Sequence, residues 1–302
     1  MTRTSEDLTF EGARAALVEA LAAIGFDAGD VEPLNLGENA VFWLRSRSVI
    51  ARVGRKNVPP AMADLQVEVA RWLVGRSMPV VRPIGLAQPI HGSGQAVTLW
   101  EPVGADVVPG STADLAALLR QLHALEPPSE LALPAADPCR RARVCLERAG
   151  MLTVGDREFL NETLDDIAVR YRTLPISSAP VVLHGDANVY NVFRSSDGRV
   201  ALGDLDTVAI GPPELDLVPT AVYHDRLGWL TEREYDEFVA IYGVDVRGWS
   251  GYQLVAQAVE LELVAWLAQN AGASPWAAEE LIRRMRTLRA GVSRRTWRPF
   301  LG

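Results

Sequence analysis

The sequence predicts an α+β protein of two lobes, a small mixed lobe followed by a larger, mainly helical one. Short β-type runs lie between two helical segments in the first hundred residues, and leucine-rich helical spacing dominates after residue 104. The two regions meet at a short segment with Pro and Gly, residues 101–104. Since 302 residues can enclose a core in each lobe, we expect lobes over residues 1–103 and 104–302.

In the first lobe, an alanine-rich helix over 9–25 precedes β-type runs between Val31 and Val53. Pro59-Pro60 then opens a helix that reaches about Gly75, and QAVTLW at 95–100 is the clearest later strand. The helix at 60–75 has an apolar stripe, which predicts its buried face: Met62, Leu65, Val69 and Trp72.

In the second lobe, Thr112 is the predicted N-cap of a helix with leucines at i, i+3, i+4 and i+7. Further helices are predicted from Asp137, over 156–173, and after residue 231, where Thr231 and Glu234 have the spacing of a capping box. The last two are expected over about 251–270 and from Ser274-Pro275 to about 290. A strand and a hairpin that turns at Asp197-Gly198 interrupt the helices between 181 and 204.

The composition excludes several classes of protein. Hydrophobic residues make up 48% and charged residues 23%, as in ordinary globular proteins. A net charge of −8 argues against nucleic acid as a partner. No run reaches the ~18 apolar residues of a membrane span, and the N-terminal segment has no apolar signal core. With only two cysteines, Cys139 and Cys145, we expect a cytoplasmic protein without disulfides. We also expect no obligate protein partner.

One motif indicates the chemistry. Residues 184–191 read HGDANVYN after the apolar run VVL, and Asp204 follows Asn191 by thirteen positions in VALGDLD. This spacing matches the protein-kinase pattern of an Asp and an Asn on one loop and a second Asp after the next strands. Phosphoryl transfer needs a carboxylate near the attacking hydroxyl and oxygen ligands for a magnesium ion on the phosphates. The alternative is a hairpin with polar turn residues and an unrelated Asp, which the joint spacing disfavours.

Residues 183–217 resemble the signature of the aminoglycoside phosphotransferase and choline-kinase-like family, whose fold is protein-kinase-like. The resemblance implies that Asp186 is the catalytic base and that Asn191 and Asp204 bind Mg²⁺. It gives His184 and Asp216 supporting roles: His184 braces the loop, and Asp216 holds the loop backbone through buried hydrogen bonds.

Two details of this region stay open. Asp206 either assists at the metal or is a solvated or capping residue. The loop interior, Ala187-Asn188-Val189-Tyr190, departs from the Leu-His-Pro-Gly-like stretch that the family often has. His123, in LLRQLHAL, is interpreted as a hydrogen-bonded core histidine.

The first lobe carries the nucleotide side of the resemblance. Gly37 and Asn39 lie in LGENAVF, where the family places its phosphate-covering loop, although an ordinary hairpin turn explains this stretch equally well. Arg52 in VIARV takes the place of the lysine that grips the nucleotide phosphates. Glu68 on the next helix is the expected carboxylate partner of Arg52, with a surface ion pair as the alternative.

The segment LWEPV resembles the hinge whose backbone binds a purine, so Trp100 and Val103 are expected to contact ATP or GTP. The resemblance thus implies transfer of a γ-phosphate to a hydroxyl of a small-molecule acceptor. An antibiotic, aminoglycoside-like or another natural product, is the leading acceptor by family analogy. A metabolic kinase of choline, an amino alcohol, a sugar or a nucleoside is the close alternative, and a nucleotide-binding regulatory module without turnover is a third.

The charge around Asp186 should distinguish a polycationic acceptor from the less charged alternatives. A polycationic acceptor needs at least two carboxylates near Asp186 besides the metal ligands. Acidic residues are plentiful at 156–166 and 231–262, and we expect most of them, Glu262 included, to be on the surface, with a few lining an acceptor cleft. The arginines between 283 and 298 are interpreted as a solvated helix face and tail.

Overall fold

The computed structural model describes residues 8–37, 39–56, 60–273 and 275–299. Three residues of the predicted turns and helix starts, Glu38, Pro59 and Ser274, lie outside the described residues. The chain forms two compact units, and the predicted α+β fold of two lobes is confirmed. Both units are discontinuous in sequence: the first comprises Met1–Gly110, Pro128–Ala132 and Tyr190–Thr207, and the second comprises Ser111–Pro127, Leu133–Val189 and Val208–Gly302.

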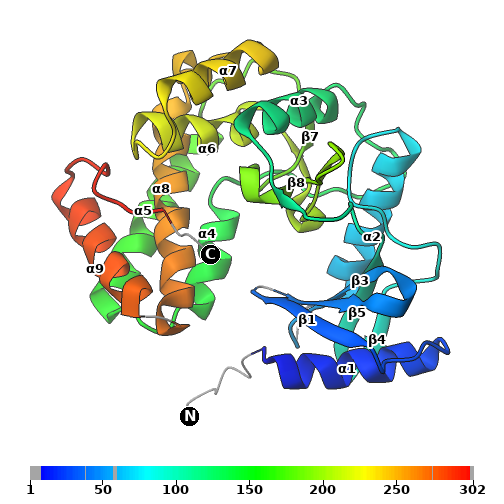
Figure 1. Ribbon diagram of the computed structural model, residues 1–302. Helices are drawn as coiled ribbons and strands as arrows, with labels where there is room; N and C mark the ends of the chain where they lie inside the picture. Colours follow the sequence, from blue (N-terminus) through cyan, green and yellow to red (C-terminus); the bar gives the residue numbers. More distant parts are fainter. Residues whose placement is uncertain (1–7, 38, 57–59, 274, 300–302) are drawn as a thin grey trace. The chain divides into compact units, whose positions relative to one another are not determined.

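An antiparallel five-stranded sheet forms the centre of the first unit (Figure 1). Its order is β1 (Val31–Leu36), β2 (Ala40–Leu44), β3 (Val49–Val53), β5 (Gln95–Trp100) and β4 (Ile90–Gly92). In β2 and β3, buried residues alternate with partly exposed ones, because one face of these strands packs into a core that includes residues of α1 (Phe10–Ala23). Gly92 permits the close approach of α1, since a Cβ atom there would lie 2.0 Å from the Ala16 carbonyl oxygen.

Two smaller parts complete the first unit. Helix α2 (Pro60–Gly75) buries Val67, Val69, Ala70 and Leu73, so the predicted stripe is only half right: Val69 and Trp72 are buried, but Met62 is exposed. A three-stranded sheet has the order β6 (Val108–Pro109), β8 (Val192–Arg194) and β9 (Val200–Leu202). The predicted hairpin is formed by β8 and β9, and Gly198 supplies the positive φ of its turn, 86°.

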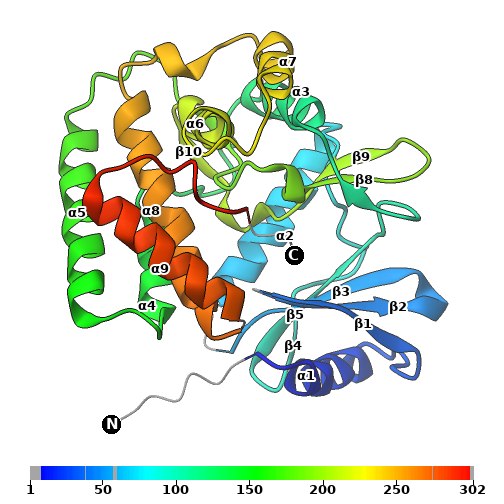
Figure 2. The same cartoon turned by 60° about the vertical axis from the view of Figure 1, so that its left-hand side comes forward.

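The second unit is mainly helical, with α8 at its centre. Helix α8 packs against α4, α5, α6 and α9, and both views show it between these helices (Figures 1 and 2). A two-stranded sheet, β7 (Val181–Leu183) with β10 (Ala209–Gly211), lies beside α3. The helices are α3 (Thr112–His123), α4 (Arg140–Arg148), α5 (Val154–Arg172), α6 (Glu214–Asp225), α7 (Glu232–Tyr242), α8 (Tyr252–Asn270) and α9 (Pro275–Ala290).

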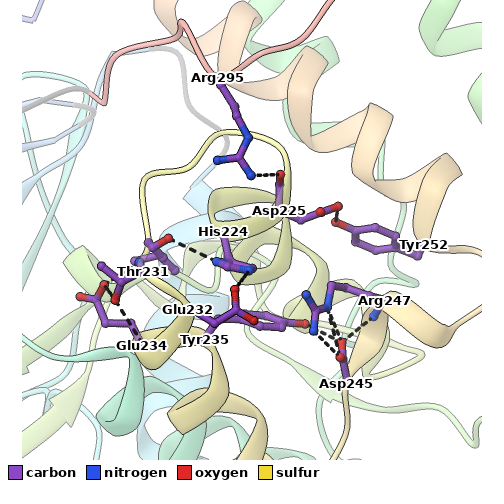
Figure 3. A network of polar contacts seen from close by, with 11 residues as sticks. His224, Asp225, Thr231, Glu232, Glu234, Tyr235, Asp245, Arg247, Tyr252 and Arg295 are labelled. Atoms are coloured by element: carbon purple, nitrogen blue, oxygen red, sulfur yellow. Dashed lines mark hydrogen bonds and ion pairs between the residues drawn. The ribbon is translucent and has the colours of Figure 1, made fainter.

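Polar contacts fix the segment between α6 and α7 (Figure 3). The predicted capping box is confirmed: the Thr231 hydroxyl accepts from the Glu234 N–H, and the Glu234 carboxylate accepts from the Thr231 N–H at 2.8 Å. The His224 ring stacks on Tyr235, whose hydroxyl donates to Asp245 at 2.8 Å. These contacts attach the start of α7 to the end of α6 and to the segment that follows α7.

Three details of the second unit differ from the sequence predictions. Ser111, not Thr112, is the N-cap of α3, and it forms a capping box with Asp114. Helix α6 was not predicted, because it includes Pro219 in its interior and proline usually interrupts a helix. Arg284 is not solvated but buried. Its guanidinium donates to Glu280 at 3.0 Å and lies over the rings of Trp229 and Trp297. No helix in the described part of the chain is long and apolar enough to cross a membrane.

Candidate active site

The segment after β7 is held by one buried carboxylate. Asp216, in the first turn of α6, is 1% exposed and accepts the backbone N–H of His184 at 2.6 Å and that of Gly185 at 2.9 Å. Gly185 has φ +80°, a conformation that a residue with a Cβ adopts at a cost. These bonds confirm the expected role of Asp216, because they fix the backbone immediately before Asp186.

His123 supports Asp216 from α3. Its Nε2 atom lies 3.0 Å from Asp216 and its Nδ1 atom 2.8 Å from the Tyr242 hydroxyl. Because a carboxylate only accepts, Nε2 carries the proton and donates to Asp216. Burial raises the pKa of Asp216, but the hydrogen bond from His123, the charges of His123 and His184 and the Gly185 N–H outweigh burial and hold this pKa below its ordinary value. His123 is therefore a hydrogen-bonded core histidine, as predicted.

The side chain of Asp186 lies in a small charged group within the second unit. Its Oδ1 atom accepts from Asn188 Nδ2 at 3.1 Å, and its Oδ2 atom forms an ion pair with Arg141 of α4. The Nε atom of Arg141 lies 3.1 Å from the carboxylate of Glu262, on α8. Burial raises the pKa of Tyr223, and the charges of Asp186 and Glu262 raise it further, so the phenol stays protonated.

Asn191 and Asp204 lie at the open end of the β8–β9 hairpin, within the first unit. Val192 pairs with Leu202, and the Gly203 N–H donates to the Asn191 carbonyl at 2.8 Å. The hairpin therefore brings the Asn191 backbone next to the residue that precedes Asp204. Asp204 itself has φ +53°, an uncommon conformation for a residue other than glycine and one that is frequent at functional sites.

Arg52 pairs with these aspartates and not with Glu68. Its Nη2 atom lies 2.9 Å from Asp204 Oδ1 and 3.5 Å from Asp206 Oδ2. Glu68 is exposed on α2, and among the described residues the structure does not bring it to Arg52. Helix α2 buries Val67, Val69 and Ala70 and leaves Glu68 exposed, and a nucleotide-binding role for Glu68 stays a prediction.

The β1–β2 turn and the end of β5 hold the remaining predicted nucleotide contacts. The Gly37 N–H donates to the Asn39 carbonyl at 3.0 Å, and the Gly37 carbonyl accepts from Arg55 at 3.2 Å. Trp100 is buried, with its indole N–H bonded to Thr98 at 2.8 Å, and Val103 is half-buried in the segment after β5. The purine contacts of Trp100 and Val103 stay predictions.

The residues of the hairpin end fit a magnesium ion by their chemistry. Mg²⁺ takes oxygen ligands and usually binds through one or two carboxylates together with substrate phosphates. Asp204 supplies a carboxylate and Asn191 an amide oxygen. That Asp204 and Asp206 both lie near one guanidinium shows that their carboxylates face a common position for a positive charge. Within the described residues, no group of three or more His, Cys, Asp or Glu side chains has the arrangement of a metal site.

Comparison with known sequences identifies the family. The sequence profile of the phosphotransferase enzyme family (APH) matches residues 30–255. The chain belongs to this family. It is accordingly a phosphotransferase, and the resemblance drawn from residues 183–217 is confirmed. A sequence comparison with curated proteins gives no match.

Solved phosphotransferases have a similar fold. The aminoglycoside phosphotransferase APH(3'')-Id from Streptomyces rimosus is 23% identical over 80% of this chain and 96% of its own, with a TM-score of 0.59. The amicoumacin kinase hAmiN is 13% identical over 90% of this chain and 92% of its own, with a TM-score of 0.64. A microcompartment-associated aminopropanol kinase is 19% identical over 93% of this chain and 99% of its own, with a TM-score of 0.62. The predicted protein-kinase-like fold is thus confirmed, while the acceptors of these relatives differ from one another.

Sequence reasoning missed some of the residues around Asp186. Arg141 lies in RRARVCLER, where nothing distinguishes it from its arginine neighbours. Glu262 was one of many acidic residues in a helical stretch. Asn188, in contrast, stands at the one place where the loop departs from the common family pattern, and that departure was a usable signal.

Proposed function

We propose that the chain transfers the γ-phosphate of ATP or GTP, with Mg²⁺, to a hydroxyl of a small natural product. The observation that carries the proposal is the fixed backbone before Asp186, where Asp216 accepts two successive N–H groups. This anchoring presents a carboxylate that is itself 15% exposed and therefore reachable by an acceptor. A phosphotransferase needs such a fixed carboxylate to orient the attacking hydroxyl.

In the proposed reaction, Asp186 accepts the proton of the acceptor hydroxyl while the hydroxyl oxygen forms a bond to the γ-phosphorus. The bond from that phosphorus to the bridging oxygen breaks, and a nucleoside diphosphate leaves. Asn191 and Asp204 would hold the magnesium ion, which supplies positive charge to the phosphates. Arg52 would release the two aspartates and bind phosphate oxygens, because its guanidinium is the cation on β3 that lies beside them.

The acceptor is proposed to be an antibiotic or related natural product of low positive charge. Two of the relatives with a similar fold are named for antibiotic acceptors, streptomycin and amicoumacin being bound in their structures. The contacts that join Asp186 in the described residues include one further carboxylate, Glu262, and one guanidinium, Arg141. Because the Arg141 guanidinium pairs with Asp186 itself, it would repel further cations at this position, so we propose an acceptor of low charge in preference to an aminoglycoside with many ammonium groups.

A small amino alcohol is the second candidate acceptor. The fold is also similar to that of an aminopropanol kinase over 93% of this chain. The same charge balance beside Asp186 favours a compound with few charges, whether it is a metabolite or an antibiotic. A metabolic role therefore remains the direct competitor of a resistance role.

The test is a panel of hydroxyl-bearing antibiotics and amino alcohols, scored for nucleoside-diphosphate release with ATP or GTP and magnesium. We expect at least one compound to stimulate release well above the acceptor-free rate, and Asp186→Asn to abolish the stimulation. Nucleotide binding without stimulation by any compound would favour the regulatory module over the kinase. Failure to bind magnesium and nucleotide at all would contradict the proposal.

A further inference from the structure

Three elements of the second unit place charged and polar side chains around Asp186. Arg141 comes from α4, Glu262 from α8 and Tyr223 from α6, and α8 packs against both α4 and α6 (Figures 1 and 2). The guanidinium of Arg141 lies between the two carboxylates, with Nε 3.1 Å from Glu262 and NH1 paired with Asp186. We call Asp186, Arg141 and Glu262 the charged triad.

The triad is accessible to a ligand. The side chains of Arg141 and Glu262 are 24% and 26% exposed, so neither is sealed in the core. By contrast, Glu260 of the same helix as Glu262, which pairs with Arg226 and Arg294, is only 3% exposed. The partial exposure of the triad is what a binding surface requires.

The charges of the triad define the ligand that it fits. The triad brings one guanidinium, that of Arg141, and one carboxylate besides Asp186, that of Glu262, to the same place. An ammonium group on an acceptor can pair with Glu262, whereas the Arg141 guanidinium would repel a second ammonium group beside it.

We propose that Arg141 and Glu262 set the charge of the acceptor, so that the site selects a hydroxyl compound with one ammonium group over an uncharged compound or one with two or more. This inference rests on the proposed function, since the acceptor hydroxyl must reach Asp186. Glu262 is the attractive element and Arg141 the repulsive one, and specificity commonly uses both.

A matched series of three-carbon alcohols tests the proposal. The compounds are 1,2-propanediol, 1-amino-2-propanol and 1,3-diamino-2-propanol, with no, one and two ammonium groups at pH 7. We would measure kcat/KM with magnesium and ATP for the wild-type chain, Arg141→Gln and Glu262→Gln. Arg140→Gln is the control, because Arg140 is the exposed neighbour of Arg141 on the same helix.

The expected results are ratios between acceptors, which a general loss of activity would not change. The wild-type chain should favour the monoamine over both other compounds by about tenfold or more, the size of a charge-assisted contact. Glu262→Gln should remove the advantage of the monoamine over the diol, and Arg141→Gln should raise the diamine relative to the monoamine by about tenfold. Arg140→Gln should leave both ratios unchanged.

The proposal is overturned if the wild-type chain uses the diamine as well as the monoamine, or if Arg141→Gln leaves their ratio unchanged. Calorimetric titration of magnesium-ATP, which needs no acceptor, separates this failure from failure of the proposed function. Nucleotide binding together with transfer to none of the three compounds would overturn the inference about the triad alone. Absence of nucleotide binding would contradict the kinase itself.

Discussion

Two aspartates near the same loop differ in their surroundings and therefore in their roles. Asp216 is buried, and three donors from His123, His184 and Gly185 surround its carboxylate. Asp186 is 15% exposed, and its partners include the side chains of Arg141 and Asn188. A carboxylate saturated by buried donors stabilises the backbone, whereas one on a partly exposed surface can accept a proton from a ligand.

Asp186→Asn should lower kcat by about 10²–10⁴, because the amide keeps the size of the side chain but cannot act as a general base. The Kd of magnesium-ATP should change less than threefold, since our proposal assigns Asp186 to the acceptor. Steady-state kinetics and calorimetric titration of the nucleotide measure the two effects. A folded variant with a kcat within about threefold of the wild type would remove Asp186 from the mechanism.

Asp204→Asn should weaken magnesium-nucleotide binding more than Asn191→Ala, because the carboxylate contributes charge and the amide does not. The measurement is the rise in Tm that magnesium-ATP produces at a fixed concentration, which follows the affinity by mass action. Asp206→Asn serves as the comparison, since Asp206 lies farther from Arg52, at 3.5 Å. An undiminished rise in Tm for Asp204→Asn would show that Asp204 is not a ligand.

Local spacing along the chain predicted these residues, but it could not predict their partners. The motif at 184–191 is contiguous, so its loop was accessible from the sequence, and the resemblance to the family supplied the role of Asp216. One partner of Arg52, Asp204, is 152 positions away, and the resemblance to the kinase pattern suggested Glu68 in its place. Contacts of this kind depend on how the strands are ordered in space, which no periodicity records.

At the scale of elements, long periodic helices were predicted well and irregular starts were not. Helix α5 follows clear apolar spacing, and the structure has it together with α8 and α9 near their expected ranges. Helix α6 was missed because Pro212, Pro213 and Pro219 indicate a loop, although Pro at the sixth helical position removes only one backbone donor. Thr112 was assigned as a cap because it has the right side chain, yet its hydroxyl donates to the Glu234 carbonyl at 3.2 Å.

Ser111→Ala should lower the free energy of unfolding by about 1 kcal/mol, the usual effect of losing an N-cap side chain. Ser111 accepts from the Asp114 N–H at 3.2 Å, and alanine would leave that donor without its capping partner. Chemical denaturation of the variant measures the change. Ser129→Ala is the control, because Ser129 is an exposed serine outside the helices, and an equal loss in both variants would contradict the assignment of the cap.

At the scale of the whole molecule, each compact unit combines distant stretches of sequence. The hairpin that holds Asn191 and Asp204 belongs with the first unit, although it is flanked in sequence by segments of the second. A linear reading finds a linker at 101–104 but cannot show that a later segment returns to the first unit. The fold class could be predicted because it depends on the kinds of elements, whereas membership of a unit depends on long-range pairing such as that of β6 with β8.

The stability of the whole chain should fall in acid, and Asp216 should account for a measurable part of the loss. Six carboxyl groups of the described residues have a pKa below the ordinary value: Asp30, Glu32, Asp197, Asp216, Glu234 and Asp245. Of these, Asp216 is the buried one, so solvent screens its interactions least. The folded chain therefore binds fewer protons than the unfolded chain as these groups titrate, and protonation favours unfolding.

The stabilisation from Asp216 is complete above the ordinary pKa of 3.8 and disappears as the pH falls through the lowered value. Asp216→Asn should lower the free energy of unfolding at pH 7 by about 1–3 kcal/mol, because an amide cannot accept from all three donors. The difference between the variant and the wild type should shrink below about pH 4, as the wild-type carboxyl becomes protonated. Denaturant unfolding between pH 3 and 7 measures both effects. Asp245→Asn is the control, because the pKa of Asp245 is also lowered, to about 2, but its carboxyl is 39% exposed. A difference between Asp216→Asn and the wild type that stays constant from pH 7 to pH 3 would show that Asp216 is not an ionised anchor of the loop.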